Sequence, residues 1–105
     1  MRIFHIATES DWAEALEVGE YATSTLGVSL EDEGFIHASR ADQWEGVRAR
    51  FYADLAEPLV LLEVETDLLE VPVVEEVPGP GTAETFPHVY GAIPTIAVVA
   101  IVPLT

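Results

Sequence analysis

Two segments of the chain place a short β-rich run directly before a helix-capping signal, and this repeated pattern constrains the fold most. The first run, RIFHIA (2–7), is followed by Thr8 as the expected cap, with Asp11 three positions later. The second run, GFIHA (34–38), is followed by Ser39, with Asp42 at the same spacing. The pattern predicts a strand followed by a helix, twice.

Apolar side chains recur at helical spacing behind each cap, as expected of helices that pack against a sheet. The first set is Trp12, Ala15, Leu16 and Gly19, and the second is Trp44, Val47, Phe51 and Leu55. We therefore expect two main helices, the second ended by Pro58. Residues 19–34 between the two units are predicted to form a loop that holds at most a short strand.

Further β-rich runs occupy the second half of the chain. LVLLEVE (59–65) is a clear strand, LEVPVVEEV (69–77) is an extended stretch weakened by Pro72, and PGPGTAET (78–85) has the composition of a loop. Residues 85–105 carry no formal charge, and IAVVAIV among them is predicted to be a central strand buried on both faces. The order β-α-β-α-β-β-β predicts one compact α+β domain over residues 1–105, with a mixed sheet of about five or six strands.

The composition excludes several classes of function. The net charge is −15, from 19 acidic residues against four arginines, and such a surface repels nucleic acid and anionic membranes. The chain has no cysteine, which excludes disulfides and thiolate chemistry. No signal peptide is evident, and the longest apolar run is far shorter than a membrane span. We expect a cytoplasmic protein.

His5 and His37 share a sequence context, each standing two or three residues ahead of a predicted helix cap. Backbone N–H groups and the positive end of the helix dipole converge at such a junction, which favours an anion. A histidine there could bind a phosphate or a ribose, or titrate near neutral pH. The alternative is a half-buried histidine that fixes the end of a strand through one backbone hydrogen bond.

His88 lies in ETFPHVYGAIP, directly after the loop 78–85. If residues 86–90 are extended, Phe86, His88 and Tyr90 point to one face, because side chains alternate along a strand. This stripe could stack on a flat ring such as a nucleobase or nicotinamide. The alternative is that the two aromatic residues belong to the core and His88 ties down a loop.

Three other features have competing interpretations. Ser39 is most simply a helix cap, because IHASRAD lacks the G-x-S-x-G pattern of a nucleophile elbow. Arg40, expected in the first turn of the second helix, either pairs with the acidic run at 31–33 or holds an anionic ligand. A metal site formed by the three histidines is a minority hypothesis, since their separations contain no short zinc-type pair.

The segments IFHIA, EGFIHAS, LVLLEVE and FPHVYG, in that order, resemble the domain-of-unknown-function 952 family over nearly the whole chain. These are small bacterial single-domain proteins. The family typically has a cysteine where this chain has Ala38, so a thiol role would not operate here. The resemblance implies a fold and the position of a site rather than a reaction.

That family is in turn similar to the ADP-ribosyltransferase-like superfamily at the level of fold. The similarity implies that His5 holds a ribose of NAD and that GFIHAS supplies the second motif. The late glutamate of that superfamily has Glu75 or Glu76 as its nearest candidates, and we select Glu75. His88 is an alternative occupant of that third position.

The sequence thus predicts a cleft lined by three histidines that binds NAD or an ADP-ribose-like nucleotide. His37, His88 and Glu75 are the candidate catalytic residues for ADP-ribosyl transfer or NAD hydrolysis. The candidate ligand-binding residues are His5, Ser39, Arg40, Phe86 and Tyr90. The alternative is a non-catalytic module that senses a small ligand or binds a protein. The sequence leaves the oligomeric state open.

Overall fold

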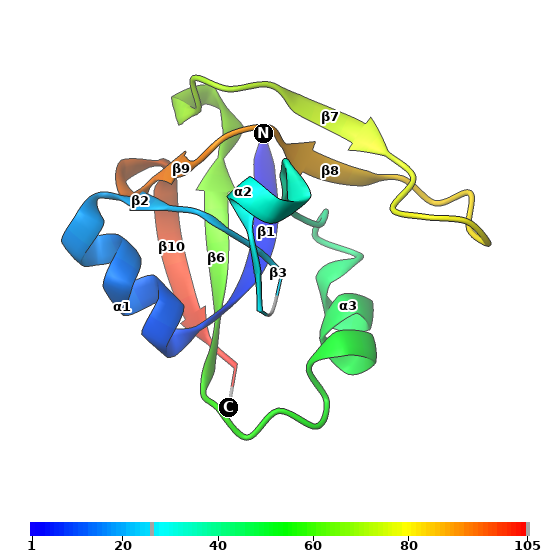
Figure 1. Cartoon of the computed structure of the whole chain (residues 1–105), viewed down its shortest axis with the longest axis horizontal. Helices are drawn as coiled ribbons and strands as arrows, with labels where there is room; N and C mark the ends of the chain where they lie inside the picture. The colour runs from blue at the N-terminus through cyan, green and yellow to red at the C-terminus, as the bar shows by residue number, and fades with distance from the viewer. Residues whose placement is uncertain (26, 105) are drawn as a thin grey trace.

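The computed structural model describes residues 1–25 and 27–104, and its centre is a three-stranded antiparallel sheet (Figure 1). The strands are β1 (Arg2–Thr8), β6 (Leu59–Glu65) and β10 (Val98–Pro103), in the order β1-β6-β10. β6 is the middle strand, and its first four residues are all buried. Burial on both faces explains why LVLLEVE begins as a continuous apolar run.

The remaining strands form smaller sheets. β8 (Phe86–Val89) lies between β5 (Ile36–His37) and β7 (Val73–Glu76). Two ladders pair β2 (Glu20–Tyr21) with β9 (Ile93–Pro94), and β3 (Thr23–Thr25) with β4 (Val28–Ser29). Every described pairing is antiparallel. The prediction of one compact α+β domain is therefore confirmed, but the single mixed sheet is wrong, because strands of two to four residues are too short to continue one sheet.

The two faces of the central sheet belong to two separate cores. Ile3 and Leu62 face the larger core, which α1 (Glu9–Val18) covers with Trp12 and Ala15. Ile6 and Leu61, one residue out of phase, face a smaller core beneath α3 (Trp44–Phe51). This two-residue alternation places the helices on opposite sides of the sheet, as Figure 1 shows.

The first predicted capping signal is confirmed. The Thr8 hydroxyl accepts a hydrogen bond from the Asp11 N–H at 3.1 Å, and α1 ends at Gly19, whose φ of 98° few other residues adopt. Trp12 and Ala15 are buried as predicted, whereas Leu16 is 58% exposed. No helix within residues 1–25 and 27–104 is long and apolar enough to cross a membrane.

The second predicted capping signal is wrong. Ser39 exchanges two backbone hydrogen bonds with Phe4 on the free edge of β1, so its backbone is committed to strand pairing. The helix begins only at Trp44, after Gln43, and no side chain caps it. Arg40 therefore precedes α3 instead of lying in its first turn. The helix also ends earlier than predicted, at Phe51, which is 61% exposed.

Residues 19–34 are more structured than the predicted loop. They contain β2, β3, β4 and a one-turn helix, α2 (Leu30–Glu33). The Ser29 hydroxyl caps α2 by accepting the Asp32 N–H, and Gly34 ends it with a φ of 92°. These elements were not predicted, because each is too short to show a hydrophobic period.

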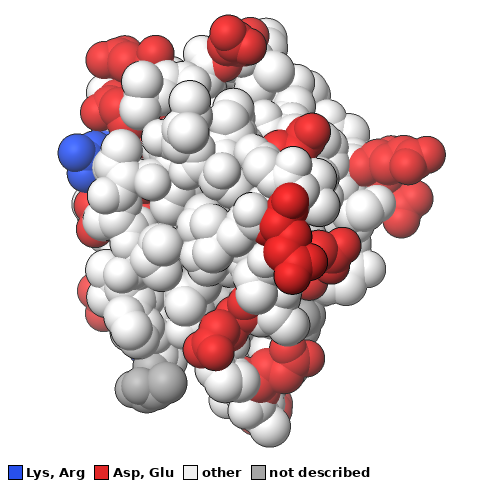
Figure 2. Space-filling model, turned by 90° about the vertical axis from the view of Figure 1, so that its left-hand side faces the viewer, with Lys and Arg blue, Asp and Glu red and all other residues white. Residues whose placement is uncertain are grey.

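The prediction that IAVVAIV is a central strand is wrong. β10 lies at the edge of the sheet, and Val99, Ile101 and Val102 are 40–46% exposed. Figure 2 shows the side of the molecule that carries α1 and β10, where a wide area without charged side chains lies among separate Asp and Glu side chains. Periodicity alone identified the strand but not its neighbours, because an apolar run is equally compatible with a central and an edge position.

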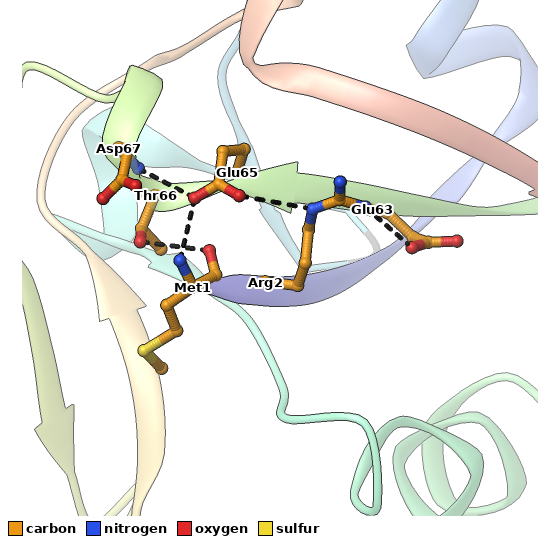
Figure 3. A network of polar contacts seen from close by, with 6 residues as sticks. All are labelled: Met1, Arg2, Glu63, Glu65, Thr66 and Asp67. Carbon is orange, nitrogen blue, oxygen red and sulfur yellow. Dashed lines mark hydrogen bonds and ion pairs between the residues drawn. The ribbon is translucent and has the colours of Figure 1, made fainter.

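Charged groups hold β1 in register with β6 near the N-terminus. The Arg2 guanidinium lies 3.3 Å from Glu63 and 3.4 Å from Glu65, and the Met1 ammonium lies 2.9 Å from Glu65 (Figure 3). The hydrogen bond from the Met1 ammonium is the main reason that the pKa of Glu65 is lowered to about 2. Arg2 and Glu65 are also direct partners in the strand register, so these contacts support that register.

Candidate functional site

Antiparallel pairing brings two of the three histidines together. His37 of β5 and His88 of β8 are direct partners across the ladder, so their side chains lie on the same face. The distance between His37 Nδ1 and His88 Nε2 is 3.3 Å. Separated by 51 residues in the sequence, these two side chains form one hydrogen-bonded pair in the fold.

A carboxylate completes this pair from the neighbouring strand. Glu76 of β7 lies 2.9 Å from His88 Nδ1, and its Oε1 also accepts a hydrogen bond from the Tyr90 hydroxyl. Because a carboxylate only accepts, His88 Nδ1 carries the proton. In a neutral His88 ring, Nε2 must then accept the proton of His37 Nδ1. While His88 is neutral, the hydrogen bonds therefore run in one direction, from His37 through His88 to Glu76.

This direction fixes the chemical state of His37. Its Nδ1 is the donor to His88, so its Nε2 carries a lone pair, and no residue in the described ranges bonds to that nitrogen. Burial, with a smaller contribution from His88, lowers the pKa of His37 to about 4. His37 is therefore neutral at pH 7, and it offers a hydrogen-bond acceptor rather than a positive charge.

Hydrogen bonds to the partners also set the protonation of Glu76 and Tyr90. The hydrogen bond from Tyr90, followed by that from His88, lowers the pKa of Glu76. The same contact with the carboxylate raises the pKa of Tyr90. Both shifts keep Glu76 ionised and Tyr90 protonated near neutral pH, which preserves the direction of the chain.

His5 lies in a separate position on β1 and is only 3% exposed. Its Nδ1 donates to the His37 carbonyl at 2.6 Å, and its Nε2 lies 2.9 Å from the Tyr21 hydroxyl. A carbonyl only accepts, so the neutral ring carries its proton on Nδ1 and accepts from Tyr21. Burial lowers the pKa of His5 to about 4. Both ring nitrogens of His5 are therefore hydrogen-bonded, and His5 holds β5 in place through the carbonyl of His37.

A cavity of about 350 Å³ lies beside the His37–His88 pair. Its walls come from β3, β5, β8 and α3, together with the ends of α2 and of the loop 78–85. The residues that line it are Ser24, Thr25, Glu33, Phe35, His37, Val47, Arg50, Phe51, Tyr52, Pro78, Phe86 and His88. Its size is near the lower end of the roughly 300–1,000 Å³ typical of small-molecule sites.

Aromatic rings fix the orientation of both histidines at this cavity. Phe35 stacks on His88, with the ring centroids 4.0 Å apart and the planes at 11°. Phe86 lies 5.1 Å from His37 at an angle of 39°. These contacts leave a predominantly aromatic wall that contains one free acceptor nitrogen, and such a wall suits a flat ring that carries a hydrogen-bond donor.

The predicted site residues divide into two groups. His37, His88 and Phe86 line the cavity, and Tyr90 is linked to His88 through Glu76 without lining the cavity. The others are not among the lining residues: these are His5, Ser39, Arg40 and Glu75. Arg40 and Glu75 instead form an ion pair with each other at 2.5 Å.

Glu76 was the alternative to Glu75 among the predicted residues, whereas Phe35, Ser24 and Arg50 were not predicted to belong to the site. Phe35 adjoins the β5 residues that were singled out. The choice of Glu76 over Glu75 depends on the pairing of Val74 with His88, because Glu76 shares a face of β7 with Val74. Ser24 and Arg50 reach the cavity from β3 and α3. No local pattern marks these two, since only the packing of their elements brings them to the histidines.

The described residues show no metal-ligand cluster and have a second cavity without a histidine. Within residues 1–25 and 27–104, no three His, Asp or Glu side chains are grouped so that they could hold a metal ion. A larger hollow of about 680 Å³ lies between α3 and the start of β6. Arg48 in its wall is bonded to the Leu104 carbonyl at 2.6 Å, and no histidine lines it.

The glycine of FPHVYG has a packing role beside the site. A Cβ atom on Gly91 would lie 2.4 Å from Val71 Cγ1 and 2.9 Å from Val71 Cβ, and a β-branched side chain has few ways to move aside. We expect Gly91→Ala to lower the free energy of unfolding by about 1–3 kcal/mol, measured by urea denaturation. The control is Gly79→Ala, where no atom lies within 4 Å. Equal stability of the two variants would contradict this role.

The fold and the cavity define a class of protein: a small α+β domain in which aromatic and histidine side chains line a cavity of about 350 Å³. The chain belongs to a family described as "Protein of unknown function (DUF952)", whose model matches residues 6–101. The resemblance found in the sequence is thereby confirmed at the level of the family.

Solved structures extend this similarity over the full chain. The crystal structure of protein CC0527 from Caulobacter crescentus shares 28% identity, with a TM-score of 0.83, over 100% of this chain and 87% of that one. A double mutant of the same protein shares 27% identity, with the same TM-score and coverage. A comparison with curated proteins found no match.

Proposed function

We propose that this protein binds a small molecule with a flat ring and an N–H or O–H donor in the cavity beside His37. The observation that carries the proposal is the directed chain from His37 to Glu76, which leaves His37 Nε2 as an unoccupied acceptor beside an aromatic wall. His88 and Glu76 hold the acceptor in one tautomer, which is the usual task of groups behind a functional histidine.

A nucleotide related to NAD or ADP-ribose is the leading ligand under this proposal. Phe35 and Phe86 would flank its ring, and His37 would accept from an amide or a ribose hydroxyl. At about 350 Å³, the cavity holds part of a dinucleotide, so the remainder would extend past its mouth. The reactions to test are ADP-ribosyl transfer and NAD hydrolysis, as expected of an ADP-ribosyltransferase-like protein.

A specific observation favours a second candidate, a module that binds this ligand without turnover. Glu75, the expected catalytic carboxylate, is held by Arg40 at 2.5 Å and by the Thr85 hydroxyl at 3.1 Å. Glu76 is held by His88 and Tyr90. Neither glutamate lines the cavity. A carboxylate that is bonded to neighbouring side chains and lies outside the cavity is poorly placed to orient a nucleophile there.

The test is a two-dimensional NMR titration of the labelled protein with NAD, ADP-ribose and nicotinamide, at pH 7. Signals of Phe35, His37 and Phe86 are expected to shift in a saturable manner. His37→Phe keeps a ring but removes the acceptor, and we expect it to weaken binding about tenfold. Glu14→Gln, on α1, is the control and should bind as the parent does.

A turnover assay on the same samples separates the two candidates. Release of nicotinamide from NAD would support the enzyme, and saturable binding without release would support the binding module. Saturable shifts that avoid the cavity residues, or the absence of shifts with every probe, would contradict the proposed site.

A further inference from the structure

The cavity also contains a buried polar group with no partner. Ser24, in the middle of β3, is completely buried and lines the cavity. Its Oγ has no hydrogen-bond partner within the part of the chain that the structure describes. A buried hydroxyl without a partner destabilises a protein, so such groups are normally satisfied. A ligand in the cavity would supply the missing partner.

Two opposite charges line the same cavity without neutralising each other. Glu33 comes from α2 and Arg50 from α3, and both side chains are exposed to solvent. Within residues 1–25 and 27–104, Arg50 forms no ion pair. In contrast, Arg2 and Arg40 are paired with glutamates.

The whole-chain charge limits what the Arg50 position can attract. A net charge of −15 opposes the approach of a purely anionic ligand. A ligand with a cationic group near Glu33 and an anionic group near Arg50 satisfies both local charges and avoids that penalty. The aromatic wall of Phe35 and Phe86 adds the requirement for a flat ring, to which a cationic ring is particularly suited.

We propose that the ligand of this cavity is a zwitterion: a flat ring with a cationic group, joined to one anionic group. Arg50 binds the anion, Glu33 the cation, and Ser24 hydrogen-bonds to the part that enters deepest. The inference rests on the proposed function and narrows its substrate class. The same chemistry occurs in pyridinium mononucleotides and in aromatic amino acids, which the experiment distinguishes.

The experiment compares matched probes by NMR titration or calorimetry at low salt. The nucleotide probes are nicotinamide mononucleotide, with both charges, nicotinamide riboside, with the cation alone, and AMP, with the anion alone. The amino-acid probes are tryptophan, tryptamine and indole-3-propionate, which vary the same two charges. In one of the two sets, the probe with both charges should bind about tenfold more tightly than either partner.

Variants assign each contact. Arg50→Gln should weaken the binding of the two-charge probe about tenfold and leave the binding of the cation-only probe unchanged. Glu33→Gln should also weaken the binding of the two-charge probe, but should leave the binding of the anion-only probe unchanged. Glu31→Gln, on the same short helix, is the control. Ser24→Ala should weaken binding but raise the Tm of the free protein by roughly 4–8 °C, because it removes an unsatisfied buried hydroxyl.

The outcomes separate this inference from the proposed function. Equal affinity within both probe sets, with shifts at the cavity, would overturn the zwitterion and leave the small-molecule site in place. Unchanged affinity in Arg50→Gln and Glu33→Gln would overturn it in the same way. Binding by no probe would overturn both.

Discussion

Acidification from pH 7 to pH 4.5 is expected to lower the free energy of unfolding of this protein by several kcal/mol. His5 and His37 have pKa values lowered from about 6.5 to about 4 by burial. Between these two values the unfolded chain binds protons that the folded chain does not, so stability falls as the pH falls. It is fully present above pH 6.5 and levels off, for these two groups, below pH 4.

The expected loss is large compared with the stability of a small domain. A change in pKa of this size corresponds to about 3 kcal/mol for the completely buried His5, and to about 2 kcal/mol for the half-buried His37. Domains of this size are stable by only about 5–15 kcal/mol. The lowered pKa of Glu76 adds a further loss at more acidic pH.

Urea denaturation at pH 7.5, 6.5, 5.5 and 4.5, followed by tryptophan fluorescence, measures this effect. In the parent protein, the slope of the unfolding free energy against pH should approach the value for an uptake of two protons on unfolding. It should approach one proton in His37→Phe, the variant in which only His5 remains to titrate in this way. A stability that is constant from pH 7.5 to pH 5 would show that the two rings are not held neutral.

Replacement of His5 by phenylalanine is expected to be the most destabilising single change in the neighbourhood of the site, by about 2–4 kcal/mol at pH 7. Phenylalanine fills the space but has no hydrogen bond to offer. The carbonyl of His37 would lose its 2.6 Å donor, and the Tyr21 hydroxyl would lose its 2.9 Å acceptor. Urea denaturation of the purified variant measures the loss.

The matched control is Tyr21→Phe, which removes one hydrogen bond and leaves His5 bonded to β5. It should cost about 1–2 kcal/mol, and the double variant should cost less than the sum, because the two residues share a contact. Strict additivity of the two changes, or a stable His5→Phe variant, would show that this buried pair contributes little. His37 would then be positioned by β8 alone.

The repeated strand-and-cap pattern shows what a local sequence signal can predict and what it cannot. Thr8 caps α1 as predicted, since its hydroxyl needs only the backbone N–H of a residue three positions later. The equivalent Ser39 does not cap α3, because Phe4 recruits its backbone into a strand pairing from 35 residues away. The same local signal therefore gave two outcomes, and a long-range contact decided between them.

The candidate site was predictable in part for the same reason. The placement of His37 and His88 on strands followed from the β-rich residues around them, and Phe86 followed from alternation. The partners Glu76, Ser24 and Arg50 depend on which strand lies beside which and on where α3 packs. Those choices are made by the burial of side chains that are distant in sequence, so no window of the chain contains them.

The sequence by itself determined that the chain forms one α+β domain, the family to which it belongs, the acidic surface, and the strands that carry the histidines. These features depend on composition, on periods of two or 3.6 residues, and on local capping. Only the tertiary structure decided that β10 is an edge strand, that His5 is enclosed, and that His37 faces a cavity with a free acceptor. Each of these features depends on which side chains, distant in the sequence, are buried against one another, and that is a property of the packed chain as a whole.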